Sequence, residues 1–427
     1  MDKQKTYLAT TLSGREYELD DPGCYRTDQG DFSPDKIKAA THKLGVVINM
    51  KDLPNDGNVL ILTAEQFAEK VRRLGVKESV INKYTTELVD AGILPLYSGS
   101  YNAVLLARML GFLQGDGHLG FTVEDYPRTH WTFGREQDAI DFNNDVEKLN
   151  ISSNKITENT AFYTSSQTTH HTWDVHKYKG FSALMMALDG VIGRKTETAS
   201  IPIPDWIMNG SPLIKREFIS GFAGADGCRI NSAIRHYPSG DNKTYDMSPM
   251  VQHKVPEHVD SSEEWFLQLK QLFDDFGINT GRILTKDTVE ERYQGKYKVC
   301  LEFSSSGDNM KNYMNIIGYR YCQTKYMESL LISEWLLYRD ILLLEIAEKR
   351  KRVYELYKTT SMSFPAIDRA MGLLNGQAQR FFHAYEENKG VNWPEGNKQA
   401  LKLIKWLDTV SYQDQFIYLP IKSITEL

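Results

Sequence analysis

The sequence is poor in cysteine, contains no long uninterrupted apolar run and carries no excess of positive charge. Its four cysteines are scattered without CxxC spacing, which argues against a zinc site and against a disulfide framework. The longest apolar candidate, Leu105–Leu113, is interrupted by Arg108 and Gly111, so we expect no membrane span. A net charge of −6 excludes a uniformly basic protein, so any phosphate-binding surface must be local.

The chain has 427 residues, of which 41% are hydrophobic and 25% are charged. This is the composition of a globular protein, and the length suits roughly two to four domains. The first residues, MDKQKTYLAT, contain no apolar segment of the kind found in secretion signals, so we expect an intracellular protein.

One pattern occurs twice. Residues 105–118 read LLARMLGFLQGDGH and residues 218–228 read FISGFAGADGC, and both are apolar, glycine-containing runs that lead into Asp-Gly. The two aspartates, Asp116 and Asp226, lie roughly 110 residues apart, which is a plausible length for one α+β unit.

The segments that follow each Asp-Gly also correspond. Alternating polar and apolar residues predict strands, and amphipathic runs predict helices, so that each copy reads helix, two strands, helix, two strands, helix. A closing helix that ends at glycine completes each copy. The predicted elements are strands 130–134 and 250–255, helices 137–149 and 262–276, strands 172–178 and 296–303, and closing helices 181–193 and 309–318.

Glycines in the two repeated helices need a reason, because glycine inside a helix costs about 1 kcal/mol relative to alanine. Gly111 and Gly115 share one helix face, as do Gly221 and Gly224. We predict that the two helices pack against each other at these faces, where small residues allow a close approach.

Asp116 and Asp226 stand at the predicted carboxyl ends of these helices, where the helix dipole disfavours negative charge by about 0.3–1 kcal/mol. Pairing the helices also brings two like charges together. A divalent cation such as Mg²⁺, Mn²⁺ or Ca²⁺ would offset both costs. For either aspartate alone, Asp-Gly is also the composition of an ordinary turn.

Residues 109–117 (MLGFLQGDG) and 219–227 (ISGFAGADG) resemble the two motifs of single-chain LAGLIDADG homing endonucleases, which also occur inside inteins. The resemblance covers roughly residues 100–330. It implies an α+β fold in which two pseudo-symmetric αββαββα halves meet at the motif helices and form a saddle over DNA. The first acidic position of the motif is occupied by Gln114 and Gly224, and the family tolerates variation there.

The same resemblance implies a site-specific double-strand DNA endonuclease. Asp116 and Asp226 would bind Mg²⁺, or alternatively Mn²⁺, with the preceding Gly115 and Ala225 also at the metal site. Family members often have a lysine near the active site. The contenders are Lys195, Lys254 and Lys325, each of which could instead be a solvated surface residue.

The implied partner is double-stranded DNA with a long, pseudo-palindromic target site. The resemblance also implies that the protein binds this DNA as a monomer, in the cytoplasm or at the nucleoid, and that it does not bind a membrane. Polar residues on the predicted strands and their flanks would contact DNA, although the solvated face of any antiparallel sheet shows the same alternation. The candidates are His130, Arg135, His176, Lys177, Arg229, Arg235, Gln252, Lys254, Arg282 and Lys298.

The two ends are predicted to be helical accessory regions. We divide the chain into an N-terminal accessory region (1–97), two LAGLIDADG halves (98–206 and 207–331) and a C-terminal region (332–427). Helices are expected at 65–74 and 78–91, and residues 361–385 resemble a helix-turn-helix. The tail 416–424 resembles the strand that follows the endonuclease insert in inteins, and the sequence leaves open whether the protein is free-standing or part of an intein.

Two alternatives remain at the level of sequence. A LAGLIDADG scaffold without cleavage activity could serve as an RNA maturase or a transcription regulator, which the negative net charge favours. An unrelated α+β protein with accidental motif matches would lack the predicted relation between the two copies.

Overall fold

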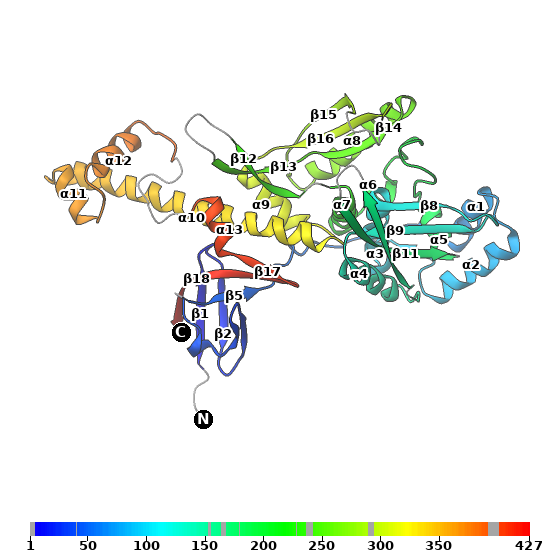
Figure 1. Cartoon of the computed structure of the whole chain (residues 1–427), viewed down its shortest axis with the longest axis horizontal. Coiled ribbons are helices and arrows are strands. Elements are labelled where there is room, and N and C mark those ends of the chain that lie inside the picture. Colours follow the sequence, from blue (N-terminus) through cyan, green and yellow to red (C-terminus); the bar gives the residue numbers. More distant parts are fainter. Residues whose placement is uncertain are drawn as a thin grey trace. The chain divides into compact units, whose positions relative to one another are not determined.

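The computed structural model describes residues 5–39, 41–152, 155–163, 168–178, 180–227, 229–235, 242–288, 294–391 and 401–427. Within these residues the protein is a mixed α/β structure with thirteen α-helices and several sheets (Figure 1). It divides into two compact units, Asn49–Asn231 with Tyr245–Ser329, and Met1–Ile48 with Ser232–Thr244 and Leu330–Leu427. None of the helices searched among the described residues is long and apolar enough to cross a membrane.

The first copy has the predicted order of elements, with one antiparallel sheet in the order β10-β11-β9-β8. In β9 every second residue is buried, including Trp131 and Phe133, because α4 and α5 cover that face of the sheet. The opposite face carries Arg128, His130 and Thr132. The elements are α3 (Tyr101–Asp116), β8 (Gly117–Phe121), β9 (Pro127–Phe133), α4 (Glu136–Lys148), β10 (Ile156–Tyr163), β11 (Thr168–Tyr178) and α5 (Gly180–Ala187).

The second copy contains the predicted helices and strands and one additional strand before α8. Its main sheet has the order β14-β16-β15, which matches β9-β11-β10 of the first copy, while β12 and β13 pair with each other. Helix α8 covers one face of the main sheet. The elements are α6 (Asp205–Met208), α7 (Pro212–Ala225), β12 (Ile230–Arg235), β13 (Asn242–Met247), β14 (Met250–Lys254), the 3₁₀ turn Pro256–His258, α8 (Val259–Asp274), β15 (Thr280–Asp287), β16 (Tyr297–Phe303) and α9 (Gly307–Ile316).

Helices α3 and α7 pack against each other, as the glycines predicted. A Cβ added to Gly111 would lie 2.0 Å from the carbonyl oxygen of Phe218, and one added to Gly221 would lie 2.1 Å from that of Arg108. Because neither backbone can accommodate a methyl group at that distance, the crossing requires glycine on both helices.

The other two glycines behave differently from each other. Gly115 faces the Ala225 side chain of α7, where an added Cβ would lie 2.3 Å from the alanine Cβ. Gly224, predicted to share the α3-facing side with Gly221, instead faces the backbone of Arg320, whose carbonyl oxygen would lie 1.7 Å from an added Cβ. The absence of a side chain at Gly224 therefore allows close approach of the backbone at Arg320, in the segment before α10, and not of α3.

Two helices precede the first copy, close to their predicted bounds: α1 (Ala64–Arg73) and α2 (Glu78–Asp90). Thr63 and Gln66 form a capping box at the start of α1. Both helices pack against α5, and the short strands β6 (Leu60–Leu62) and β7 (Leu96–Tyr97) flank them.

Residues 5–39 and 41–48, the described part of the first 48, form strands and turns without an α-helix, which corrects the prediction of a helical region for this part of the N-terminus. Five strands there join two C-terminal strands in one sheet of order β2-β1-β18-β5-β3-β4, with β17 on β18. Strand β1 buries alternate residues and pairs with β18, so its partner lies some four hundred residues away and leaves no local signal. The elements are β1 (Thr6–Thr11), β2 (Glu16–Asp20), β3 (Tyr25–Thr27), β4 (Gly30–Phe32), the 3₁₀ turn Pro34–Lys36, β5 (Lys43–Val46), β17 (Ser411–Gln413) and β18 (Phe416–Glu426).

The helical part of the C-terminal region is confirmed, although the region ends in β17 and β18. Its helices are α10 (Gln323–Thr359), α11 (Phe364–Ala370), α12 (Gln377–Glu386) and α13 (Leu403–Thr409). Helices α11 and α12, the predicted helix-turn-helix, pack against α10 through a buried apolar cluster that includes Val353, Ile367 and Phe381.

Candidate active site

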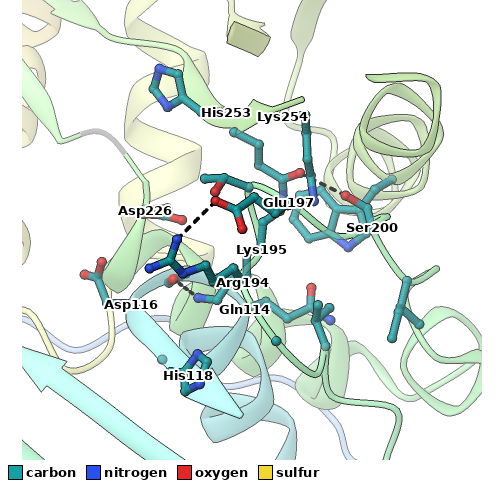
Figure 2. Close-up of a pocket in the computed structure, with 18 of the residues that line it drawn as sticks. Gln114, Asp116, His118, Arg194, Lys195, Glu197, Ser200, Asp226, His253 and Lys254 are labelled. Carbon is teal, nitrogen blue, oxygen red and sulfur yellow. Dashed lines mark hydrogen bonds and ion pairs between the residues drawn. The ribbon is translucent and has the colours of Figure 1, made fainter. Parts of the chain in front are cut away.

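The two repeated aspartates meet in one pocket. Helix α3 ends at Asp116, and Asp226 is the C-cap of α7, which confirms their predicted places at the helix ends. Both line a cavity of about 440 Å³, and Figure 2 shows them on the same wall of it. Asp116 is exposed to solvent and Asp226 is half-buried. The close helix pairing is what brings these two carboxylates together.

The site disfavours two negative charges. The pKa of Asp226 is raised from 3.8 to about 6, first by burial and then by the charge of Asp116, while Lys195 and Lys325 oppose the rise. Although the Asp116 side chain reaches solvent, the protein packed around it desolvates the carboxyl and raises its pKa, against the opposing charges of Lys325 and Lys195. The positive charges nearby therefore do not fully balance the pair.

Two of the three predicted lysines are at the site, in corresponding positions. Lys195, in the loop after α5, donates from Nζ to the carbonyl of Gly115, the residue before Asp116. Lys325, in the first turn of α10, donates to the carbonyl of Ala225, the residue before Asp226, and to that of Gly224 at 2.8 Å. Burial lowers the pKa of Lys195, while Asp226 and Asp116 oppose that effect.

Lys254, the third contender, does not contact the aspartates directly. It is 3% exposed, and its Nζ donates to the carbonyls of Lys195 at 2.6 Å and Thr198 at 2.9 Å. Burial lowers the pKa of Lys254 to about 8. These two hydrogen bonds hold the loop that carries Lys195.

The register of β14 also changes the predicted DNA-facing set. Gln252 and Lys254 lie on the face that α8 covers, and the Gln252 carboxamide oxygen accepts a hydrogen bond from Ser262 of α8 at 2.8 Å. His253 points to the other face, where it pairs across the sheet with Lys298, which in turn pairs with Lys286. Gln252, His253 and Lys254 all line the aspartate pocket, and the contacts of Gln252 and Lys254 with DNA stay a prediction.

The remaining candidates are distributed unevenly. His130 and His176 lie opposite each other on the open face of the first sheet. Arg135 is instead the exposed N-cap of α4, and Arg229 lies in the loop after α7, paired with Glu328. Arg282 on β15 is exposed and within 3.8 Å of Glu302. The side chains of Lys177 and Arg235 lie outside the described residues.

A buried ionic cluster behind the pocket was not predicted. Arg108 of α3 pairs with Glu217 of α7 at 2.6 Å and with Asp145 of α4, and Arg320 pairs with Glu217 at 2.9 Å. Burial alone would raise the pKa of Glu217, but Arg108, Arg320 and Arg216 overcome it and lower that pKa to about 2. The cluster ties α3 to α7, and its sequence signal was the presence of charged residues inside two otherwise apolar helices.

The donor set suits a hard divalent cation. Two carboxylates, with the carbonyls of Gly115 and Ala225 beside them, are all oxygen donors, which Mg²⁺, Mn²⁺ and Ca²⁺ prefer. Burial and the neighbouring Asp116 charge together raise the pKa of Asp226, and a bound cation would favour the ionised form against both effects. The amines of Lys195 and Lys325 already place positive charge on these two carbonyls.

No family model matches the chain, but several curated proteins do. A tRNA-splicing ligase RtcB of Methanocaldococcus jannaschii is 30% identical over 310 residues, which are 70% of this chain and 29% of that protein. The DNA-directed RNA polymerase subunit Rpo1N of the same organism is 24% identical over 90% of this chain and 28% of its own length. Its replication factor C small subunit is 25% identical over 87% of this chain and 20% of its own length. This chain spans less than a third of each of these relatives.

Among solved structures, the homing endonuclease I-WcaI bound to its DNA recognition sequence aligns with 52% of this chain and 85% of its own, at a TM-score of 0.33 and 11% identity. Mesophilic variants of the homing endonuclease I-DmoI align with 50% of this chain and 96% of their own, at a TM-score of 0.29 and 12% identity.

Proposed function

We propose that this chain is a site-specific, divalent-metal-dependent DNA endonuclease of the LAGLIDADG homing type, with its active centre at Asp116 and Asp226. One observation carries the proposal: two glycine-notched helices end side by side in acidic residues, and a lysine amine sits on the carbonyl before each of them. Two unrelated turns would not converge in one pocket with matching cationic neighbours.

The two carboxylates and the adjacent carbonyls of Gly115 and Ala225 would hold Mg²⁺ or Mn²⁺. A cation held by these groups would supply an activated water for attack and would neutralise charge on the scissile phosphate. Lys195 and Lys325 add positive charge where the phosphate becomes more negative, and they are already oriented by the backbone. Lys254 would hold the loop that carries Lys195 in place, because its amine donates to the carbonyls of Lys195 and Thr198.

The DNA surface would be the pair of open sheet faces opposite α4, α5 and α8. The matching strand orders β10-β11-β9 and β15-β16-β14, on either side of the α3–α7 pair, support a pseudo-symmetric saddle. His130 and His176 in one half, and His253, Lys286 and Lys298 in the other, supply polar and basic groups there. A monomer with two such faces suits a long, pseudo-palindromic duplex. Basic side chains concentrated on these faces can bind phosphates even though the net charge of the whole chain is −6.

The curated relatives support a mobile module rather than their own named activities. A ligase, a polymerase subunit and a replication factor subunit each match most of this chain with a minor part of their length. A segment shared by such different proteins does not account for what distinguishes them. Insertion of the same module into different hosts explains that distribution, and it fits the homing function.

The test is cleavage of a plasmid library that carries a randomised insert, with Mg²⁺, by the full chain and by Asp116→Asn and Asp226→Asn. We expect linear products from the native protein and loss of cutting in both variants. The matched control is Asp90→Asn at the exposed end of α2, which should cut normally. Undiminished cutting by both active-site variants would refute the proposed chemistry.

A binding-only role is the second candidate, supported by the paired helices α11 and α12 and by the negative net charge. Selection of bound, uncut duplexes or RNAs from random pools in EDTA distinguishes it. Tight metal-independent binding without cleavage in Mg²⁺ or Mn²⁺ would favour that role over hydrolysis.

A further inference from the structure

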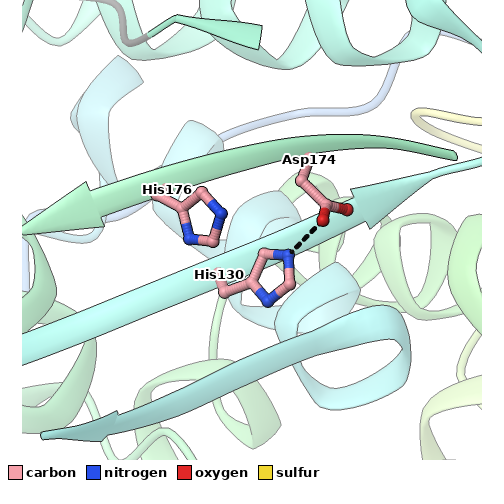
Figure 3. Close-up of side chains that lie close together, drawn as sticks. All are labelled: His130, Asp174 and His176. Atoms are coloured by element: carbon pink, nitrogen blue, oxygen red, sulfur yellow. Dashed lines mark ion pairs between the residues drawn. The ribbon is translucent and has the colours of Figure 1, made fainter. Parts of the chain in front are cut away.

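Three potential metal ligands gather on the open face of the first sheet, outside the pocket of the aspartates. His130 on β9 pairs directly with His176 on β11, and Asp174 pairs with Thr132 two residues along the same strands, which keeps both pairs on one face. Directly opposed residues of antiparallel strands point to the same side, so the three side chains project together (Figure 3).

Their donor atoms already converge. One nitrogen of each histidine and one carboxylate oxygen of Asp174 all lie within 4.8 Å of one another, and no other group of three such ligands is found among the described residues. His130 Nε2 is 3.0 Å from Asp174 Oδ2, and the two imidazoles stack with centroids 4.3 Å apart. Ligands held about 2.0–2.1 Å from a tetrahedral ion are about 3.3 Å apart, so small ring rotations would suffice.

The carboxylate at this cluster is placed as a metal ligand would be. Asp174 is only 7% exposed, and no protein group donates to its buried Oδ1. Leaving a buried charged oxygen unpaired is costly, and a cation satisfies it. The other oxygen, Oδ2, accepts a hydrogen bond from Asn159 of β10, which fixes the orientation of the carboxylate.

We propose that His130, Asp174 and His176 form a second metal site, selective for a borderline divalent ion such as Zn²⁺ and separate from the hard-cation site at Asp116 and Asp226. Two imidazoles favour Zn²⁺ over Mg²⁺ or Ca²⁺, whereas the aspartate pair offers oxygen alone. Three protein ligands on rigid strands leave the fourth tetrahedral position open toward the sheet's outer side.

The location of the site suggests what the open position takes, and this step rests on the proposed nuclease function. His118 of β8 pairs across the sheet with His130 and lines the aspartate pocket, so the metal site borders that pocket on the proposed DNA face. There, a bare Asp174 carboxylate would repel phosphate. Zn²⁺ reverses the local charge and can accept a phosphate oxygen, so it acts as an anchor for the DNA backbone.

Metal binding is tested without DNA, on the untagged full chain stripped with chelator and supplied with excess Mg²⁺ to occupy the aspartates. Titration with Co²⁺ should give the visible absorption of a tetrahedral ion, which one equivalent of Zn²⁺ removes. Asp174→Asn and His176→Gln should lose that absorption, while Asn159→Ala should weaken affinity about 10- to 100-fold. His171→Gln, on the same strand but outside the cluster, is the matched control.

Circular dichroism of each variant separates misfolding from loss of a ligand, and His130→Gln provides an independent second test of the ligand set. No tetrahedral Co²⁺ spectrum, or an unchanged one in Asp174→Asn, His130→Gln and His176→Gln, would overturn the site whatever the protein does to DNA. The reverse result, a normal spectrum in an inactive protein, would overturn the nuclease proposal alone.

The anchoring step is tested by binding to a random-sequence duplex in Ca²⁺ with and without one equivalent of Zn²⁺. Zn²⁺ should tighten binding by the native chain. Asp174→Asn should bind more tightly than the native chain without Zn²⁺, because a repulsive charge is gone, and should not respond to Zn²⁺. Equal affinity of the native chain in both conditions would refute anchoring.

Discussion

Replacing Asp226 by asparagine is expected to stabilise the metal-free protein at pH 7. In the native chain, burial and then Asp116 raise the pKa of Asp226 from 3.8 to about 6. A shift of about two units corresponds to roughly 3 kcal/mol of unfavourable free energy for the ionised folded state, and partial solvation of this half-buried group reduces the figure to about 1–3 kcal/mol. Asparagine keeps the shape of the side chain and removes the charge.

The direction of the pH dependence follows from the same shift. Because the folded pKa lies above the unfolded one, the native protein takes up a proton on folding between about pH 4 and 6, and its stability gains from Asp226 as pH falls through 6. Asp226→Asn should lack that component. Asp116→Asn should recover part of the same energy, and the double variant should gain less than the sum because the two charges act on each other.

The assay is unfolding followed by circular dichroism in EDTA, from pH 4.5 to 7.5, for the native chain, Asp226→Asn and the Asp90→Asn control. A divalent cation at about 100 times its Kd should then stabilise the native chain by about 2.7 kcal/mol and the Asp226 variant much less. A variant less stable than the native chain at pH 7 in EDTA would refute the reasoning. So would an equal response of both proteins to the cation.

Three further outcomes follow from the contacts around the pocket. Glu217→Gln should destabilise the protein by about 3–5 kcal/mol in urea unfolding, because it leaves buried arginines without their anion. Gly111→Ala should cost at least about 1–3 kcal/mol, since its Cβ would lie 2.0 Å from the Phe218 carbonyl, whereas Gly134→Ala, with open space around it, should be nearly neutral. Lys195→Met should lower the rate of cleavage about 10²- to 10³-fold while duplex affinity changes little, as measured in single-turnover assays with saturating protein.

The local sequence pattern was sufficient to predict an element where the burial of one face shows in that element's own residues. The alternation in β9 and the amphipathic run of α4 were visible because one face of each is buried. Gly111 and Gly221 foretold a close helix crossing because glycine inside a helix is otherwise a penalty. The aspartates followed as the common end of two such helices.

Where a residue's environment comes from another part of the chain, the sequence was misleading. At β14 the order Met-Val-Gln-His-Lys supports either parity. The structure buries Lys254, whose amine donates to two loop carbonyls, and leaves Gln252 partly exposed and hydrogen-bonded to Ser262. The burial of Lys254 therefore depends on acceptors from another part of the chain, which the strand's own pattern does not contain. The pairing of β1 with β18 likewise depends on a partner at the far end of the chain.

The site itself combines both kinds of information. The carboxylates come from the repeated helices, but the lysines come from a loop and a helix that follow the closing helices, and each reaches back to the residue before an aspartate. Each lysine therefore contacts the backbone just before one aspartate. The aspartate comes from the start of its copy of the repeat and the lysine from beyond the end of that copy, so each aspartate–lysine pair needs both. Lys254→Met should shift the loop that carries Lys195, and it should therefore alter Lys195 in the first half without changing Lys325 in the second. We expect the pH–rate profile of cleavage to change for Lys254→Met and to stay the same for Lys83→Met, which replaces an exposed lysine.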